Sequence, residues 1–224
     1  MENFITPFLL LIVFQVTATS KVKPFTLYGK VTDTDSGFVL IRNLIKPAAD
    51  TVRIIKGEFR FSGEIEEVTP FVIADITNKY QIFFIAPKSE VHMTLKKNEM
   101  VLVDVTGSEP QDIYKKLVIS QMPAQKVMDQ LRQAIQQPTA NRDSLQQLMS
   151  QTGNQMNANF YQFLKDHGNS EVASFWVYSS ISQDRGIDAT IADSMYSFLN
   201  GKGVSSFYGT EAKKTIDKLR LLAE

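Results

Sequence analysis

The hydrophobic period of this chain changes near Ser108, and this change limits the folds that the chain can adopt. Residues 25–107 alternate apolar and polar side chains with a period of two, the pattern of half-buried β-strands. After Ser108, apolar side chains recur at the spacing of amphipathic helices. A run of strands followed by a run of helices is typical of the α+β class, in which helices pack on an antiparallel sheet.

About eight short strands are expected in the alternating half, which predicts an antiparallel β-sandwich. Strand 79–86 is apolar on both faces, so we expect it to be central and covered on both sides. Strand 90–96 alternates cleanly and places His92 on its outward face. Turn-forming residues separate the expected strands, which are 25–31, 38–43, 51–55, 58–63, 70–76, 79–86, 90–96 and 100–106.

The helical half is expected to open with two helices in segment 109–137. Pro123 is predicted to separate them, because a proline inside a helix loses a hydrogen bond and clashes with the preceding turn. A long amphipathic helix follows at 142–166, with an apolar stripe of Leu145, Leu148, Met149, Met156, Phe160, Phe163 and Leu164.

Three shorter helices are expected beyond the long one. Gly168 is predicted to close the long helix in the left-handed conformation that glycine adopts readily. Ser170 and Asp188 are predicted N-caps, and Gly201 and Gly203 are predicted interruptions. The expected ranges are 171–182, 189–200 and 207–222. Trp176 shares a helix face with Val172 and Phe175, which favours a place in the core over a ligand platform.

The N-terminus has the pattern of an export signal. Residues 4–16 form an uncharged apolar run that is shorter than a membrane span and is followed by small residues, so we expect cleavage near Ser20. The alternatives are an uncleaved anchor or a buried N-terminal strand. The expected organisation is a signal peptide at 1–20, a β-sandwich domain at 21–108 and a helical segment at 109–224 packed on it. The expected location is periplasmic or secreted, with no stable membrane span after cleavage.

Composition excludes several kinds of chemistry. The chain has no cysteine, which rules out disulfides, thiol catalysis and thiolate metal sites. Its 24 basic and 24 acidic residues balance, so nothing points to nucleic acid. The two histidines, His92 and His167, lie far apart, whereas a metal site needs several converging ligands. Asp35-Ser36-Gly37 is interpreted as a turn, because an aspartic protease needs a second carboxylate. No cofactor and no enzymatic activity are therefore expected.

One predicted hairpin carries the candidate partner-binding residues. A two-residue turn at Lys56-Gly57 would place Arg53 opposite Arg60 on the outer face of the sheet. Like charges in that position are mildly unfavourable. Either the two side chains splay into water near Glu58 or Glu64, or they contact an anion or an acidic partner. Under the second interpretation, Arg53 and Arg60 are the binding residues.

Several short motifs follow one another in the order found in a known family of exported domains. They lie at residues 25–31, 39–40, 56–63, 82–87 and 105–108 in the β half, and at 169–176 and 204–209 in the helical half. Together they resemble the uncharacterised N-terminal domain of exported Bacteroidetes-type thiol-disulfide oxidoreductases, over roughly residues 25–222. The resemblance implies a β domain, a helical segment and then a thioredoxin-like catalytic domain with a Cys-x-x-Cys pair.

The chain departs from that family at three places. Lys56-Gly57 stands where the hairpin usually has Asp-Gly or Asn-Gly, and the turn after Pro87 lacks the expected glycine at Lys88 or Ser89. The sequence also reaches Glu224 about where the thioredoxin-like domain would start, and it has no Cys-x-x-Cys pair. No catalytic residue can therefore be carried over from the family.

These observations lead to a leading hypothesis and two alternatives. The leading one is an exported, non-catalytic binding or accessory module of the cell envelope. Its partner would be an envelope protein, and a thioredoxin-like protein is the natural candidate. The first alternative is a truncated or split thiol-disulfide oxidoreductase whose catalytic domain is missing from this chain. The second is a structural oligomer of the envelope.

Overall fold

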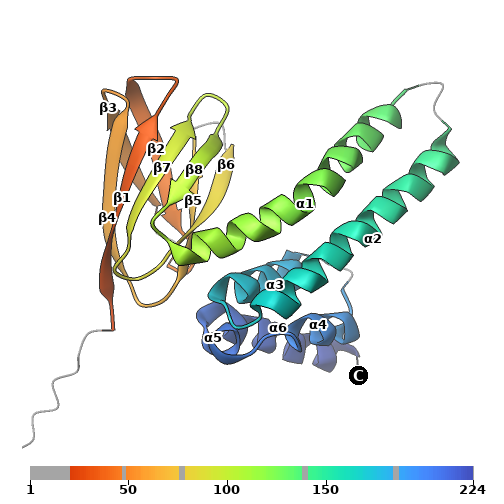
Figure 1. Cartoon of the computed structure of the whole chain (residues 1–224). Helices are drawn as coiled ribbons and strands as arrows, with labels where there is room; N and C mark the ends of the chain where they lie inside the picture. The colour runs from red at the N-terminus through yellow and green to blue at the C-terminus, as the bar shows by residue number, and fades with distance from the viewer. Residues whose placement is uncertain (1–20, 47–48, 76–78, 138–140, 184–186, 224) are drawn as a thin grey trace, which may run out of the picture.

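The computed structural model describes residues 21–223 except 47–48, 76–78, 138–140 and 184–186 (Figure 1). The predicted signal peptide at 1–20 lies outside these described residues. Strands come first and helices follow, which confirms the expected α+β class. The eight strands overlap the eight expected ranges and are β1 (Lys23–Val31), β2 (Ser36–Asn43), β3 (Ala49–Ile55), β4 (Glu58–Ile65), β5 (Thr69–Ala74), β6 (Tyr80–Ile85), β7 (Glu90–Lys96) and β8 (Val101–Thr106).

The strands form one sheet in the order β6-β5-β2-β3-β4-β1-β7-β8. Neighbouring strands are antiparallel except β1 and β7, which are parallel. Among the described residues, β3 and β4 share a single ladder pair, Ile55 with Glu58, so the sheet divides there into two four-stranded parts. Lys56 and Gly57 make the connecting turn with φ values of 53° and 75°, as a tight hairpin requires. The terminal strands β6 and β8 lie close together, so the sheet curls nearly into a barrel.

The core of the curled sheet consists of the inward side chains of all eight strands. Its centre is a group of phenylalanine rings, with 5.3 Å between the centroids of Phe25 and Phe71 and 5.9 Å between those of Phe71 and Phe83. The first pair is tilted and the second stacked, and ring pairs at this spacing add to the stabilisation that comes from burial alone. The predicted alternation of β7 is confirmed, since His92 is exposed and its neighbours on the other face, Val91 and Leu95, are fully buried.

Strand β6 differs from its expected place. It lies at one end of the strand order, so the prediction that it is central is wrong. The prediction that both faces are covered is confirmed: Phe83 and Ile85 pack inside the sheet, and Phe84 packs among the helices. The apolar pattern therefore correctly predicted that both faces of the strand are buried. An edge strand can be buried on both faces here because the helices pack against its outer face.

Six helices are described after the sheet. They are α1 (Glu109–Ala134), α2 (Arg142–His167), α3 (Glu171–Gln183), α4 (Ala189–Tyr196), α5 (Gly201–Ser205) and α6 (Phe207–Ala223). Helices α1 and α2 run antiparallel, and their paired ends project away from the sheet and from the cluster of α3 to α6 (Figure 1). No helix among the described residues is both long enough and apolar enough to cross a membrane.

Pro123 does not break α1, so the predicted division of 109–137 into two helices is wrong. Pro123 has no N–H to donate to the carbonyl of Ile119, four residues earlier. The helix continues because both residues are exposed to solvent. Water can take the place of the missing N–H on that side of the helix. The proline therefore weakens α1 without ending it.

Two glycine predictions are also corrected. Gly168 has φ −59°, a right-handed value, and not the predicted left-handed one. Glycine is needed for space instead, because a Cβ at Gly168 would overlap the carbonyl oxygen of Phe198. Gly201 and Gly203 belong to the short helix α5 and do not simply interrupt the chain.

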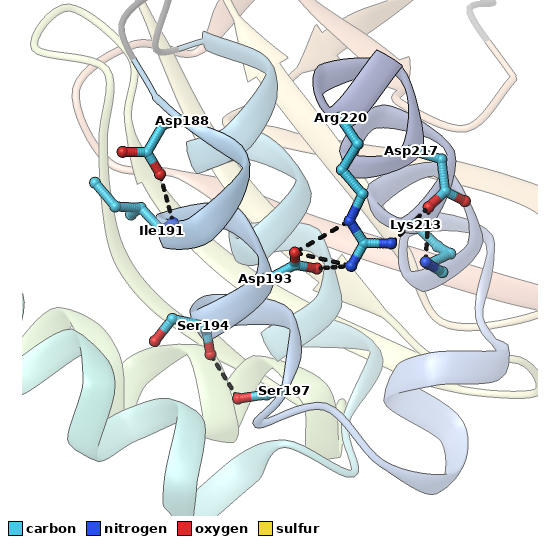
Figure 2. A network of polar contacts seen from close by, with 8 residues as sticks. All are labelled: Asp188, Ile191, Asp193, Ser194, Ser197, Lys213, Asp217 and Arg220. Atoms are coloured by element: carbon cyan, nitrogen blue, oxygen red, sulfur yellow. Dashed lines mark hydrogen bonds and ion pairs between the residues drawn. The ribbon is translucent and has the colours of Figure 1, made fainter. Parts of the chain in front are cut away.

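Polar contacts hold the helical cluster together at its surface (Figure 2). The predicted N-cap is confirmed, since Asp188 accepts a hydrogen bond from the N–H of Ile191 at 2.8 Å. Arg220 of α6 donates to both carboxylate oxygens of Asp193 in α4, with its Nη2 at 2.8 Å from each. Bidentate arginine–carboxylate pairs fix the relative position of the two side chains better than single ion pairs do. The predicted cap at Ser170 is confirmed by a 3.2 Å bond from the N–H of Ala173.

Candidate binding groove

A groove of about 790 Å³ lies along α1, where α2 and α3 face it. Its size falls within the range of ligand-binding clefts. The end nearest the sheet is apolar and is lined by Tyr114, Leu117, Val118, Met122, Met156, Phe160 and Trp176. The size of the groove and its predominantly apolar wall make it the candidate functional site.

The groove exists because the apolar stripe of α2 is only partly covered. Of the predicted stripe, Phe163 and Leu164 at the C-terminal end are buried, whereas Leu148 is 47% exposed. Helices α3 to α6 lie beside the C-terminal half of α2. The N-terminal half of α2, which projects from the body, packs against α1 alone among the described helices (Figure 1). On α1, Met122 is correspondingly 61% exposed. Exposed apolar side chains beside a hollow are typical of an interaction surface.

Trp176 stands in the wall of this groove. Its ring stacks on that of Tyr114 with 5.8 Å between centroids and meets Phe175 edge-on at 5.2 Å. Burial raises the pKa of the Tyr114 hydroxyl, which therefore stays neutral. Val172 and Phe175 are buried as predicted, but Trp176 is only half-buried. The sequence identified its helix face and missed the groove beside it.

Two polar atoms in the groove wall lack a protein partner. The Nε1–H of Trp176 and the Oε1 of Gln121 are closed off from solvent and make no hydrogen bond among the described residues. The other end of the Gln121 amide is engaged, since its Nε2 donates to the carbonyl of Met156 at 3.0 Å. An unsatisfied buried donor or acceptor costs about 1–3 kcal/mol. The wall therefore offers one free donor and one free acceptor.

The far end of the groove is polar and nearly neutral. Gln125, Gln130 and Gln133 line it, together with one cation, Lys126, and one anion, Asp129. Asp129 is already engaged, since it accepts hydrogen bonds from Gln125 at 2.9 Å and from Arg132 at 3.3 Å. With one cation and one anion among its lining residues, the groove carries few charges, and Lys126 is the one that makes no ion pair within the described parts of the chain.

The two predicted partner-binding arginines lie on the neighbouring strands β3 and β4. The predicted hairpin register is confirmed, since Ile55 pairs with Glu58, but among the described residues the β3–β4 ladder ends there, so Arg53 and Arg60 are not a ladder pair. Arg53 pairs with Phe38 of β2, and Arg60 pairs with Tyr28 of β1. The strands part after one ladder pair, and for that reason the hairpin register does not extend to the arginines. Both arginines are exposed, and the Cζ of Arg60 lies 5.4 Å from the Tyr28 ring centroid.

The two histidines occupy separate surroundings. His92 stacks on Tyr28 with 5.1 Å between ring centroids, and its Nε2 lies 3.3 Å from a carboxylate oxygen of Glu90. His167 ends α2, where burial lowers its pKa. Within the described parts of the chain, no three His, Cys, Asp or Glu side chains are placed to hold a metal ion. Asp35 belongs to the turn that enters β2, as expected.

A second hollow of about 640 Å³ lies where the sheet meets the helices. Glu67 in its wall accepts hydrogen bonds from the N–H of Phe207, the first residue of α6, at 3.0 and 3.1 Å. Burial of Glu67 nevertheless raises the pKa of its carboxyl, and nearby Glu171 and Glu66 add to that effect. This acidic hollow ties the sheet to the helical cluster and supplies a pH-sensitive contact.

Residues 25–114 match the family model described as "Domain of unknown function (DUF4369)". The match covers the sheet and the first residues of α1. The groove lies mostly beyond it, on the remainder of α1 and on α2 and α3. Comparison with curated proteins and with solved structures found no match.

Proposed function

We propose that this chain is an exported, non-catalytic binding module of the cell envelope that holds a protein partner in the groove along α1. The observation that carries the proposal is the uncovered apolar wall of Val118, Met122 and Trp176, next to a helix pair that projects from the body. A projecting pair of helices with one unsatisfied face is suited to receive another chain. The N-terminal apolar run supports export, and the lack of cysteine supports a role without thiol chemistry.

The position of the groove makes a matched experiment possible. Met122 and Ile119 lie three residues apart on α1 and are similarly exposed, at 61% and 66%, but only Met122 lines the groove. Met122→Glu should abolish capture of partner protein from an envelope extract, because a charge in the apolar wall resists desolvation. Ile119→Glu adds the same charge outside the groove and should leave capture intact. Equal capture by the two variants would remove the groove as the binding site.

Export and the absence of catalysis have their own tests. Mass spectrometry of the envelope protein should find an N-terminus near residue 21, and an intact Met1 on cytoplasmic protein would contradict export. An insulin-reduction assay with dithiothreitol should give no turnover above the reductant-only blank, because the chain has no thiolate nucleophile.

A second candidate function is that of the non-catalytic part of a split or truncated thiol-disulfide oxidoreductase. It is favoured by Leu221 and Leu222 near the end of α6, which are 73% and 85% exposed and would suit a covering domain. An open reading frame that continues beyond Glu224 into a Cys-x-x-Cys domain would support this candidate over the first.

A further inference from the structure

The groove wall carries polar atoms that match a peptide group. Trp176 supplies an unsatisfied N–H and Gln121 an unsatisfied carbonyl oxygen, both in the wall of one groove. A peptide group bears one donor and one acceptor, the two kinds of partner that these atoms lack. Buried polar atoms are nearly always paired in folded proteins, so an unpaired donor and acceptor in one wall call for a partner.

Resting on the proposed function, we infer that the occupant of the groove is an extended, uncharged, apolar segment of a polypeptide. Its side chains lie against Val118, Met122 and Met156, and one of its peptide groups bonds with Trp176 Nε1 and Gln121 Oε1. The amide of Gln125 already donates to Asp129, but Gln130 and Gln133 further along offer amide groups to the backbone of the same segment. Each of these amides both donates and accepts, as a strand backbone requires.

Charge and length define the segment further. The wall carries one charge of each sign, on Lys126 and Asp129, and Asp129 is already paired with Arg132, so a strongly charged occupant meets at most one counter-charge. The lined part of α1 runs from Tyr114 to Gln133, which is about 28 Å at 1.5 Å per residue. An extended chain of about nine residues covers that length at about 3.3 Å per residue.

Both unpaired atoms are shielded from solvent in the unoccupied groove. The occupant reaches them by displacing side chains beside them, and Met122 and Met156 are suited to that movement. A methionine has three rotatable bonds and adapts to irregular surfaces at low cost. Adaptable methionines next to fixed aromatic rings suit a groove that accepts various apolar sequences.

Trp176 is the single tryptophan of the chain, so its fluorescence reports occupancy of the groove directly. The probe is a nine-residue peptide of alternating Val and Thr with blocked ends, titrated into the purified protein. We expect a saturable change in emission. The same peptide with alternate backbone nitrogens methylated keeps the side chains and loses donors, and it should bind at least about fivefold more weakly.

Variants distinguish hydrogen bonding to a peptide group from nonspecific hydrophobic binding. Trp176→Phe keeps an aromatic ring and removes the donor, so affinity for a fluorescein-labelled probe should fall about fivefold. The denaturation midpoint of the Trp176→Phe variant should fall only by the amount expected for a smaller buried ring, because the indole N–H has no hydrogen bond to lose. Gln121→Met should also weaken the probe about fivefold, and Ile119→Glu should not change its affinity.

Three results would overturn the inference. The first is equal binding of the methylated peptide, and the second is tighter binding of an uncharged amphipathic helical peptide. The third is an emission change that depends on protein concentration alone, which would make the occupant a second copy of the chain. If Met122→Glu loses envelope capture while no peptide binds, the peptide chemistry is wrong and the proposed function stands. If capture is also indifferent to Met122, both are wrong.

Discussion

The side chain of Gln111 in α1 accepts a hydrogen bond from the backbone N–H of Phe84 in β6 at 2.9 Å. Ser108 completes the contact by donating to the carbonyl oxygen of Phe84 at 2.8 Å. Both interactions are buried, and Phe84 lies at the end of the strand order, where its backbone has no further strand to pair with. Side chains from the start of α1 therefore satisfy an edge strand and join the sheet to the helices.

Gln111→Ala should destabilise the whole chain. It leaves the buried N–H of Phe84 without a partner, which costs about 1–3 kcal/mol of the free energy of unfolding. Denaturant unfolding measures the change, and Gln146→Ala on the exposed surface of α2 is the matched control. A single transition is expected in both variants, because the burial of Phe84 among the helices still joins the two halves into one cooperative unit. Two separated transitions would contradict that unit.

Pro123→Ala should stabilise the protein. The replacement restores a donor for the carbonyl of Ile119 and removes a clash inside α1, which is worth up to about 3 kcal/mol in the free energy of unfolding. Pro110→Ala is the control, because Pro110 lies in the first turn of α1, where an N–H has no helical partner in any case. A Pro123→Ala midpoint no higher than that of wild type would show that the projecting end of α1 contributes little to stability.

Glu67 should make stability depend on pH. Its folded-state pKa is raised by burial, so the folded protein holds the proton more tightly than the unfolded chain does. The resulting stabilisation is fully present below the ordinary pKa of 4.5 and is lost as the pH rises through the raised value. Urea titrations between pH 4 and pH 7 should show this slope reduced in Glu67→Gln. Glu64→Gln, which changes an exposed carboxylate on β4, should keep the slope.

Arg53 and Arg60 remain predicted contacts for an acidic partner surface. Arg60→Ser removes the contact with Tyr28 and should cost about 0.5–1 kcal/mol of stability, whereas Arg53→Ser should be nearly neutral. The double variant should stay folded and should capture an acidic partner less well, with a deficit that shrinks at high salt. Pull-downs at two salt concentrations measure it. Capture equal to that of wild type would leave the arginines simply solvated.

The hydrophobic periodicity of the sequence and its turn-forming residues were enough to predict the strands and most helices. The alternation of β7 and the Lys56-Gly57 turn each reflect contacts within a few residues, and local patterns record such contacts well. The family resemblance also predicted a glycine near Pro87. The structure has Lys88 there with φ 64°, so a lysine adopts the conformation that glycine favours.

The remaining features depended on contacts distant in sequence. Pro123 stays helical because its side of α1 faces solvent, and Gly168 is fixed by the approach of Phe198. The groove was missed for the same reason. The sequence shows that the stripe of α2 is apolar, but only the packing of α3 to α6 decides how much of it is covered. Exposure of Met122 follows from that packing and not from its neighbours in the chain.

The central claim is that the groove along α1 receives another polypeptide, and site-specific photo-crosslinking in living cells tests it most directly. A photoreactive phenylalanine analogue is placed at position 122, in the groove wall, or at position 119, equally exposed but outside it. The account predicts a discrete adduct with another protein from position 122 and none from position 119. No adduct at position 122, or the same adducts from both positions, would contradict it.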